Sequence, residues 1–294
     1  MRQESSFNKM KNITTEIPHA FVTGYPVGHS LSPQIHRFWL KKYKLAGTYD
    51  AVEVKPENFE AFINSLQKKS FCGGNVTLPH KEEAFRLAEK KDQAATRIGA
   101  ANTLWFENDT LCASNTDGYG FEANLDDFAP GWGGGVALVI GAGGAARAVI
   151  YTLEQRGFDC IYLVNRTKSR ADKLAGYFGK PVKVRNWSEI DDLVPEVDFI
   201  VNTTSLGMKN NLIVQDSKPF IHLDRAKPSV LVTDIVYTPL MTPILLQAKA
   251  NNLKYVDGIG MLLHQAVPGF ERWFGIRPVV DNELRQEILG KMGY

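Results

Sequence analysis

The feature that most constrains the fold of this chain is a buried strand that runs directly into a glycine-rich turn and a helix. The apolar run 136–140 is followed at once by Gly141-Ala-Gly-Gly-Ala-Ala146, and a helical pattern continues through Glu154. In such a turn the first glycine permits a tight bend, Gly143 lets the backbone approach a pyrophosphate, and Ala146 allows the helix to pack closely on the sheet. A purely structural turn would also need small residues. The position between strand and helix favours dinucleotide binding.

Strand and helix patterns alternate along most of the chain. Around the glycine turn, apolar runs predict strands at 160–164, 182–184, 199–201, 230–235 and 254–256, which is the spacing of a doubly wound nucleotide fold. The first half predicts strands at 20–23, 48–54 and 73–77, a hairpin of 103–107 with 110–114, and helices at 58–68, at 80–87 and from an N-cap Ser32 with Pro33 behind it. This alternation indicates an α/β protein with a mostly parallel sheet. The length of 294 residues suggests two domains, and the glycine-rich segment 126–135 marks a boundary.

The residues after the second strand of the nucleotide fold indicate which dinucleotide is bound. An NAD site ends that strand with an acid that accepts from the ribose 2′-hydroxyl, whereas this chain has Asn165-Arg-Thr-Lys-Ser-Arg170. Arg166 can stack on or fork onto a 2′-phosphate, so NADP is favoured over NAD. The alternative is that Lys168 and Arg170 are only the solvated first turn of the next helix. Cations at a helix N-terminus are locally unfavourable, which makes a ligand phosphate the better explanation.

Composition and charge exclude several classes of protein. The formal net charge is +2, too small to argue for nucleic acid or an anionic membrane as a partner. The longest apolar-looking run is broken by three glycines and an arginine, and the first seventeen residues show no signal peptide, so we expect a cytoplasmic protein. Cys72, Cys112 and Cys160 are widely spaced and suit a reducing compartment. The histidines and acids show no metal-ligand spacing, and we predict no metal.

The run Asn75-Val-Thr-Leu-Pro-His-Lys81 places a lysine just past an apolar strand, on the turn into a predicted helix. There it can meet a small ligand while its stem stays packed, which makes Lys81 a candidate proton donor. The alternative is an ordinary solvated lysine.

Short motifs of glycine, polar and charged residues follow one another along the chain, namely Gly28-His-Ser-Leu-Ser-Pro33, Asn75-Val-Thr-Leu-Pro-His-Lys81, Ile98-Gly-Ala-Ala-Asn-Thr103, Asn115-Thr-Asp-Gly118, Gly141-Ala-Gly-Gly144, Asn165-Arg-Thr167, Asn202-Thr-Thr-Ser205, Asp234-Ile-Val-Tyr237, and Asp257-Gly-Ile-Gly-Met261 followed by Gln265. From about His19 onward the chain resembles the shikimate dehydrogenase family. The resemblance implies NADPH-dependent, reversible reduction of 3-dehydroshikimate to shikimate, a step toward chorismate and the aromatic amino acids. It also implies a cleft between an N-terminal α/β substrate domain and a doubly wound Rossmann domain that binds NADP.

The chemistry of the residues agrees with that reaction. Adding hydride to a ring ketone builds negative charge on oxygen, so the site needs a proton donor or a cation there. Lysine is ordinarily protonated at neutral pH, and the resemblance pairs Lys81 with Asp117 as a catalytic dyad. Taken alone, Asp117 would be interpreted as the N-cap of the helix that begins at Gly118.

The resemblance also implies contacts for the remaining site residues. Ser30 and Ser32 place hydroxyls and free backbone donors where a carboxylate could sit, although Ser32 could equally be a simple N-cap. The predicted substrate contacts are Ser30, Ser32, Asn75, Thr77, Lys81, Asn102, Asp117, Tyr237 and Gln265. The polar members could instead cap turns, and Tyr237 could be a packed aromatic. The predicted cofactor contacts are Gly141, Ala142, Gly143, Gly144, Ala145, Asn165, Arg166, Thr167, Arg170, Ile235 and Gly258.

The expected domain organisation is discontinuous. Residues 1–117 form the first segment of the substrate domain, with 1–17 as a flexible extension, residues 118–257 form the NADP-binding domain, and residues 258–294 return to the substrate domain. The last segment is predicted to hold two amphipathic helices, at 261–273 and 281–289. Closure of the domains over ligand is a natural hypothesis for such a cleft. An exposed edge strand of the first domain could pair in a homodimer.

Two other functions compete with this interpretation. An NAD-dependent quinate or shikimate dehydrogenase should carry an acid where Asn165-Arg166 stands. A catalytically silent sensor of shikimate-like ligands or NADP would be favoured by loss of Lys81 or Asp117, and both are present.

Overall fold

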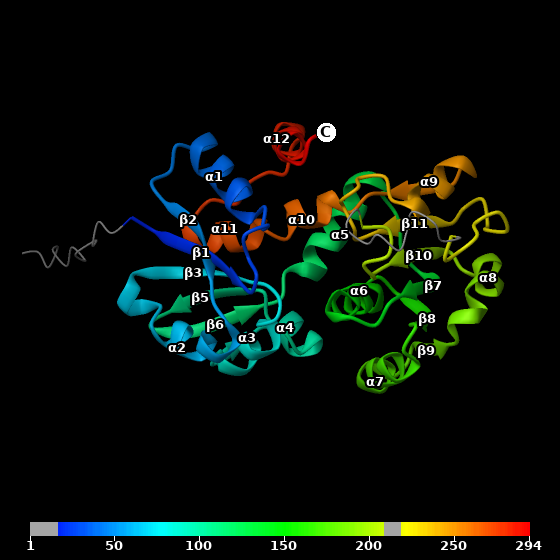
Figure 1. The fold of residues 1–294 in the computed structure, drawn as a ribbon, viewed down its shortest axis with the longest axis horizontal. Coiled ribbons are helices and arrows are strands. Elements are labelled where there is room, and N and C mark those ends of the chain that lie inside the picture. The colour runs from blue at the N-terminus through cyan, green and yellow to red at the C-terminus, as the bar shows by residue number, and fades with distance from the viewer. Residues whose placement is uncertain (1–16, 209–218) are drawn as a thin grey trace, which may run out of the picture.

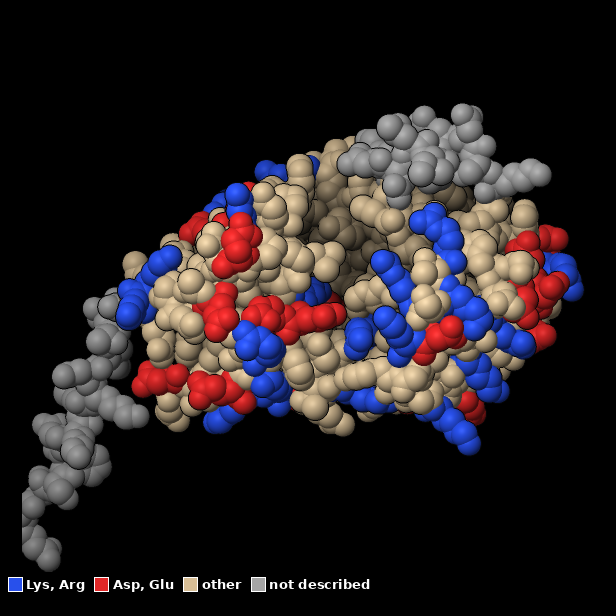
Figure 2. Space-filling view, turned by 60° about the horizontal axis from the view of Figure 1, so that its bottom comes forward, with Lys and Arg blue, Asp and Glu red and all other residues tan. Residues whose placement is uncertain are grey.

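The protein consists of two lobes, each built around one six-stranded sheet (Figure 1). The computed structural model describes residues 17–208 and 219–294. Apart from Ile17, the predicted N-terminal extension lies outside the described residues. A hollow separates the two lobes in the space-filling view (Figure 2). Within the described segments, no helix is long and apolar enough to cross a bilayer.

The first sheet is mixed, and its strands follow the order β2-β1-β3-β5-β6-β4. Strand β1 is parallel to both of its neighbours, β2 and β3. The hairpin β5–β6 is antiparallel and joins β3 through antiparallel pairs of β5, and both residues of its turn, Asn108 and Asp109, have positive φ. The strands are β1 (His19–Gly24), β2 (Thr48–Glu53), β3 (Phe71–Val76), β4 (Lys90–Lys91), β5 (Thr103–Glu107) and β6 (Thr110–Ser114). Of these six strands only β4 was not predicted, because its two residues are too few to show the alternation of apolar and polar side chains that marks a strand.

Helices cover both faces of this sheet, and strand alternation divides its core in two. Ala20 and Val22 of β1 face a cluster with α1 (Ser32–Lys42), whereas Phe21 faces the opposite cluster with α2 (Phe59–Asn64) and α3 (Lys81–Leu87). The other helical segments of this part are η1 (Pro56–Asn58), η2 (Gln67–Lys69) and α4 (Gln93–Ile98).

Two predicted helix boundaries in the first lobe are wrong. The predicted helix 58–68 is split, because the Ser65 hydroxyl donates to the Phe62 carbonyl at 2.7 Å and α2 ends at Asn64. Ser32 is not an N-cap: α1 begins at Ser32, its cap position is Leu31, and the Ser30 hydroxyl oxygen accepts the Ser32 N–H at 3.3 Å. A side chain two residues earlier therefore does the capping.

The second sheet is entirely parallel, in the order β12-β11-β10-β7-β8-β9. This is the Rossmann order, with its switch point between the two strands β7 and β10. Because both faces of β7 are covered, Ala137 and Val139 join one core cluster while Leu138 and Ile140 join the other. The strands are β7 (Gly135–Ile140), β8 (Phe158–Val164), β9 (Val182–Arg185), β10 (Phe199–Asn202), β11 (Leu231–Asp234) and β12 (Lys254–Val256). The covering segments are α6 (Gly144–Gln155), α7 (Lys168–Phe178), η3 (Trp187–Glu189), α8 (Ile190–Leu193), η4 (Val194–Glu196) and α9 (Pro243–Ala250).

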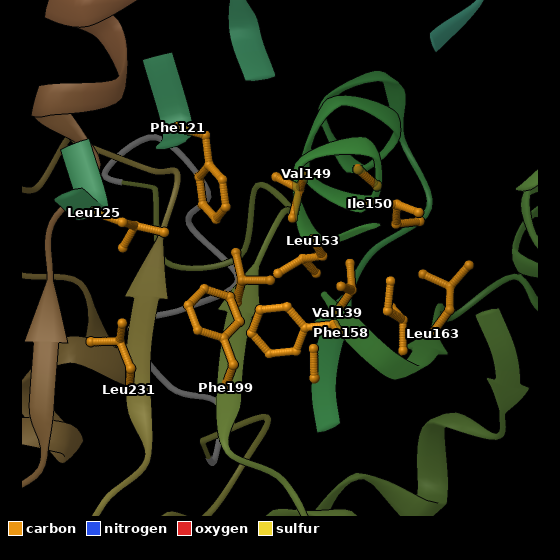
Figure 3. Packing of buried hydrophobic residues seen from close by; sticks show 14 of the residues in the cluster. Phe121, Leu125, Val139, Val149, Ile150, Leu153, Phe158, Leu163, Phe199 and Leu231 are labelled. Carbon is orange, nitrogen blue, oxygen red and sulfur yellow. The ribbon is translucent and has the colours of Figure 1, made fainter. Parts of the chain in front are cut away.

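Helix α5 (Asp117–Phe128) joins the two lobes. Figure 3 shows Phe121 and Leu125 of α5 pointing into the core of the second sheet, where Phe121 meets Phe199 edge-on at 6.2 Å between ring centroids. On its other side α5 crosses α10 (Ile259–His264), and a Cβ at Gly120 would come within 2.5 Å of the Met261 carbonyl oxygen. This close crossing brings the C-terminal segment back to the first lobe.

The C-terminal helices pack on the first sheet. The predicted helix 261–273 is wrong as a single element, because the chain bends at Gln265 and Ala266 between α10 and α11 (Val267–Phe274); Pro268, which has no amide hydrogen, lies at the start of α11. Helix α11 lies on β3 and β5, and the Trp273 indole N–H donates to the Leu104 carbonyl at 2.9 Å. Helix α12 (Asn282–Met292) lies against α1.

Candidate active site

A cavity of about 320 Å³ lies between the lobes, at the C-terminal ends of β1 and β3. All nine predicted substrate contacts line it, namely Ser30, Ser32, Asn75, Thr77, Lys81, Asn102, Asp117, Tyr237 and Gln265. Ile235 and Gly258, predicted to contact the cofactor, also line it. The fold thus gathers residues from six separate stretches of sequence, and their individual roles stay predictions.

An ion pair between Lys81 and Asp117 forms part of the cavity wall. Lys81 is the first residue of α3 and Asp117 the first of α5, and Lys81 Nζ lies 2.5 Å from Asp117 Oδ2. The side chains are 24% and 15% exposed, so both reach the cavity while their stems are packed. The interpretation of Asp117 as an N-cap is wrong, because the cap position is Thr116 and the Asp117 carboxylate is turned toward Lys81 and Asn102.

Asn102 holds the carboxylate of the pair in place. Its Nδ2 donates to Asp117 Oδ1 at 2.8 Å, and its Oδ1 accepts the Thr116 N–H at 2.8 Å. The Thr116 hydroxyl donates to the Gln265 carbonyl at 2.8 Å, which links this network to the C-terminal segment. Asn102 is thus bonded within the protein as well as lining the cavity.

Asn75 is held in place by Tyr49, a residue that was not predicted from the sequence to belong to the site. The Tyr49 hydroxyl donates to Asn75 Oδ1 at 2.6 Å, and Asn75 Nδ2 donates to the Asn102 carbonyl at 3.1 Å. Tyr49 is fully buried and stacks on His36 at 3.9 Å between ring centroids. Burial lowers the pKa of His36 to about 3, so its ring is neutral. Tyr49 was missed because one tyrosine in an edge strand carries no local signal.

His80, beside the lysine, is structural. Its Nε2 lies 2.7 Å from the Val54 carbonyl oxygen, and its ring stacks on Phe59 at 4.3 Å. The bond and the stacking hold the turn from which Lys81 projects.

The opposite wall of the cavity comes from the second half of the chain. Tyr237 follows β11, and burial raises the pKa of its hydroxyl, which therefore stays a neutral hydrogen-bonding group. Gly258 lies against the backbone of Ile235, because a Cβ there would come within 2.7 Å of the Ile235 carbonyl carbon. The lack of a side chain at Gly258 thus allows its backbone to pack closely against Ile235, the residue that follows β11.

The glycine-rich turn presents an open helix N-terminus. Gly141 has φ of +110°, and a Cβ there would meet the Thr203 hydroxyl oxygen at 2.6 Å, so glycine is required. At Gly143 and Gly144 a Cβ would meet nothing within 4 Å, and no side chain caps the helix that follows. Free backbone donors in open space at a helix N-terminus suit a pyrophosphate. The observed turn therefore fits a dinucleotide, although its residues do not line the central cavity.

The turn between β8 and α7 carries positively charged side chains. Arg166 and Arg170 are exposed and form no ion pair within residues 17–208 and 219–294, whereas Lys168 Nζ pairs with Asp172 at 2.9 Å. Asn165 connects the two turns, because its Oδ1 accepts the Ala142 N–H at 3.1 Å. Figure 2 shows many Lys and Arg side chains gathered on this lobe beside the hollow. The two unpaired arginines are therefore available for a phosphate.

A second cavity, of about 540 Å³, adjoins the first and shares His29, Leu31, Ile235 and Tyr237 with it. Its remaining walls are Thr203, Thr204, Ser205, Met208, Val236, Thr238 and Met292. Because Thr203 also touches Gly141, this cavity leads from the central site toward the glycine turn. His29 and Met292 were not predicted as site residues. Across the part of the chain that the structure describes, no group of three or more potential ligands could hold a metal ion.

Comparison with known proteins gives one consistent family. Family models match the chain as the shikimate dehydrogenase substrate binding domain over residues 22–104, as shikimate / quinate 5-dehydrogenase over 127–259, and as the shikimate 5'-dehydrogenase C-terminal domain over 258–281. A curated relative, shikimate dehydrogenase (NADP(+)) of Bartonella tribocorum, is 63% identical over 278 residues, which cover 95% of this chain and 96% of the relative.

Solved structures agree with the sequence relatives. Shikimate dehydrogenase of Aquifex aeolicus is 36% identical with a TM-score of 0.82, covering 94% of this chain and 99% of that one. Shikimate 5-dehydrogenase of Thermus thermophilus, in complex with NADP(H) and shikimate, is 33% identical with a TM-score of 0.78, covering 93% and 99%.

Proposed function

The chain belongs to the shikimate dehydrogenase family and is an NADP-dependent oxidoreductase of the shikimate pathway, and from this premise we propose a role for two residues. Lys81 and Asp117 handle the proton in the reversible reduction of 3-dehydroshikimate to shikimate. The observation that carries this proposal is the 2.5 Å ion pair in the wall of the cavity. When bound, the nicotinamide supplies the hydride to the ketone carbon.

Lys81 donates a proton to the ketone oxygen as negative charge develops there. Asp117 stabilises the ammonium group before the reaction, and Asn102 keeps the carboxylate turned toward it. The Lys81 side chain is 24% exposed, so solvent can return the proton after each turnover. In the direction of oxidation, Lys81 first loses its proton to solvent, and its neutral amine then accepts the proton from the shikimate hydroxyl.

The other lining residues hold the ring. Ser30 and Ser32, at the start of α1, offer the substrate carboxylate two hydroxyl groups in the cavity wall. Asn75, Thr77 and Gln265 supply neutral groups for the ring hydroxyls, and Tyr237 closes the opposite side. A polyol with one carboxylate matches a cavity whose polar side chains are mostly neutral.

The cofactor lies, in this proposal, along the second cavity toward the glycine turn. The open N-terminus of α6 receives the pyrophosphate through the backbone of Gly141 to Ala145. Arg166, with Arg170 and Thr167 next to it, receives the 2′-phosphate that distinguishes NADP from NAD. Ile235 and Gly258 border the nicotinamide.

We further propose the domain division 1–117, 118–257 and 258–294, with the last segment part of the substrate domain. The packing of α11 on β3 and β5 supports it. The edge position of β2 supports a homodimer through that strand, which light scattering can test. A cytoplasmic location suits the biosynthetic role.

The test of the proposed chemistry is a spectrophotometric assay of 3-dehydroshikimate reduction with NADPH and NADH side by side. Lys81→Ala should lower kcat by about 10²- to 10⁴-fold, with much of the substrate affinity retained. Lys55→Ala, which removes an exposed lysine of the same lobe, is the matched control and should leave kcat unchanged. Full turnover by Lys81→Ala would refute the role of the lysine, and a wild-type protein that is inactive with both cofactors would refute the proposed reaction.

A further inference from the structure

One loop carries much of the wall that faces the substrate. Residues 235–242 connect β11 to α9 and contain Ile235, Tyr237 and Thr238, which line the two cavities. The loop contains no helix or strand, so hydrogen bonds from its surroundings must define its conformation. Asp234, the last residue of β11, is the charged group that lies directly at its start.

Asp234 bonds both the start of the loop and the neighbouring strand. The residue is only 1% exposed, and its Oδ1 accepts the Val236 N–H at 2.9 Å and Asn202 Nδ2 at 3.0 Å. Asn202 is the last residue of β10, and its Oδ1 accepts the Thr204 N–H at 3.0 Å. Through Asn202, the Asp234 carboxyl group is therefore connected to the Thr203–Thr204 wall of the second cavity as well.

The second carboxyl oxygen and the end of the same loop are both buried. Asp234 Oδ2 and the Thr242 hydroxyl are both buried without a hydrogen-bond partner among the described residues, yet Thr242 lies close enough to lower the pKa of Asp234. Burial is the larger effect and raises that pKa to about 6. Thr242 is fully buried and precedes α9, and no hydrogen bond joins its hydroxyl to the Asp234 carboxyl group.

We propose that Asp234 is a positioning residue, whose carboxyl group ties the start of loop 235–242 to the end of β10 and thereby sets where Ile235 and Tyr237 stand in the cavity. The inference rests on the proposed function, because it takes Tyr237 to face the substrate. Asp234 itself touches neither cavity. On the outer side the loop is held separately, since the Tyr294 hydroxyl accepts the Leu240 N–H at 2.8 Å.

The experiment compares two substitutions at this position in the full chain. Asp234→Ala removes all the bonds and should raise the KM for shikimate about ten- to a hundredfold, with a smaller change in kcat. Asp234→Asn keeps an oxygen for Val236 and Asn202, so it should stay within about threefold of wild type.

Thr233→Val is the matched control for a loss of stability alone. The Thr233 hydroxyl is buried and donates to the Val256 carbonyl at 2.9 Å, away from the loop, so this variant should lose stability but keep the wild-type KM. Calorimetric titration with shikimate gives the affinity independently of turnover. An inactive wild-type protein would therefore count against the proposed reaction and not against the positioning role of Asp234. Unchanged shikimate affinity in Asp234→Ala, or equal losses in Asp234→Ala and Asp234→Asn, would overturn the inference.

Discussion

The substitution Asp234→Asn should make the stability of this protein less dependent on pH. The Asp234 carboxyl group is buried, and burial raises its pKa from 3.8 to about 6 against the lowering effect of its hydrogen bonds. Below pH 3.8 the carboxyl group is protonated in both the folded and the unfolded protein. As the pH rises from 3.8 to the folded pKa of about 6, the unfolded chain gains from ionisation and the folded protein does not, so stability is lost.

The magnitude follows from the difference between the two pKa values. A shift from 3.8 to about 6, at 1.36 kcal/mol per pH unit, amounts to about 3 kcal/mol in the free energy of unfolding once the pH is above both values. About 2 kcal/mol of this change falls between pH 4.5 and pH 7.5. The asparagine carries no charge and keeps the hydrogen bonds, so the variant should gain that amount relative to wild type over the same interval.

Urea unfolding followed by tryptophan fluorescence at the two pH values measures the effect. Contributions from all other titrating groups cancel in the difference between variant and wild type. Asp224→Asn, at an exposed carboxylate, controls for the change from acid to amide. If the stability difference for Asp234→Asn stays constant with pH, or falls as the pH rises, the carboxyl group is not desolvated in the folded protein and the reasoning fails.

Three further substitutions test other parts of the site. Arg166→Ala should raise the KM for NADPH by about ten- to a hundredfold and leave that for NADH unchanged, because only NADPH carries the 2′-phosphate; parallel kinetics with both cofactors check this. Gly258→Ala should lower kcat/KM by about tenfold, since the added Cβ would stand within 2.7 Å of the Ile235 backbone, and a crystal structure should show the loop displaced. Tyr49→Phe should cost about 1–3 kcal/mol in urea unfolding and raise the KM for shikimate, because Asn75 Oδ1 loses its buried donor; an unchanged KM would remove Tyr49 from the site.

The outline of the fold could be predicted because its signals are local. The run 136–140 is apolar on both faces, and only a covered parallel strand buries both. The hairpin β5–β6 was predicted to the residue, since Asn108 and Asp109 tolerate the positive φ that such a turn requires. Helix boundaries were less predictable at Ser65 and Gln265, where side-chain bonding and packing against other helices decided them.

The sequence by itself determined which chemical groups the site contains, and the tertiary structure decided how they meet. Lys81 and Asp117 are 36 residues apart, and no local pattern sets their 2.5 Å separation; it arises because α3 and α5 both begin at one end of the first sheet. The supporting residues Tyr49, Thr116 and Asp234 act through partners distant in sequence or through burial. Hydrogen bonding and desolvation depend on the surroundings in space, and only the folded chain supplies those surroundings.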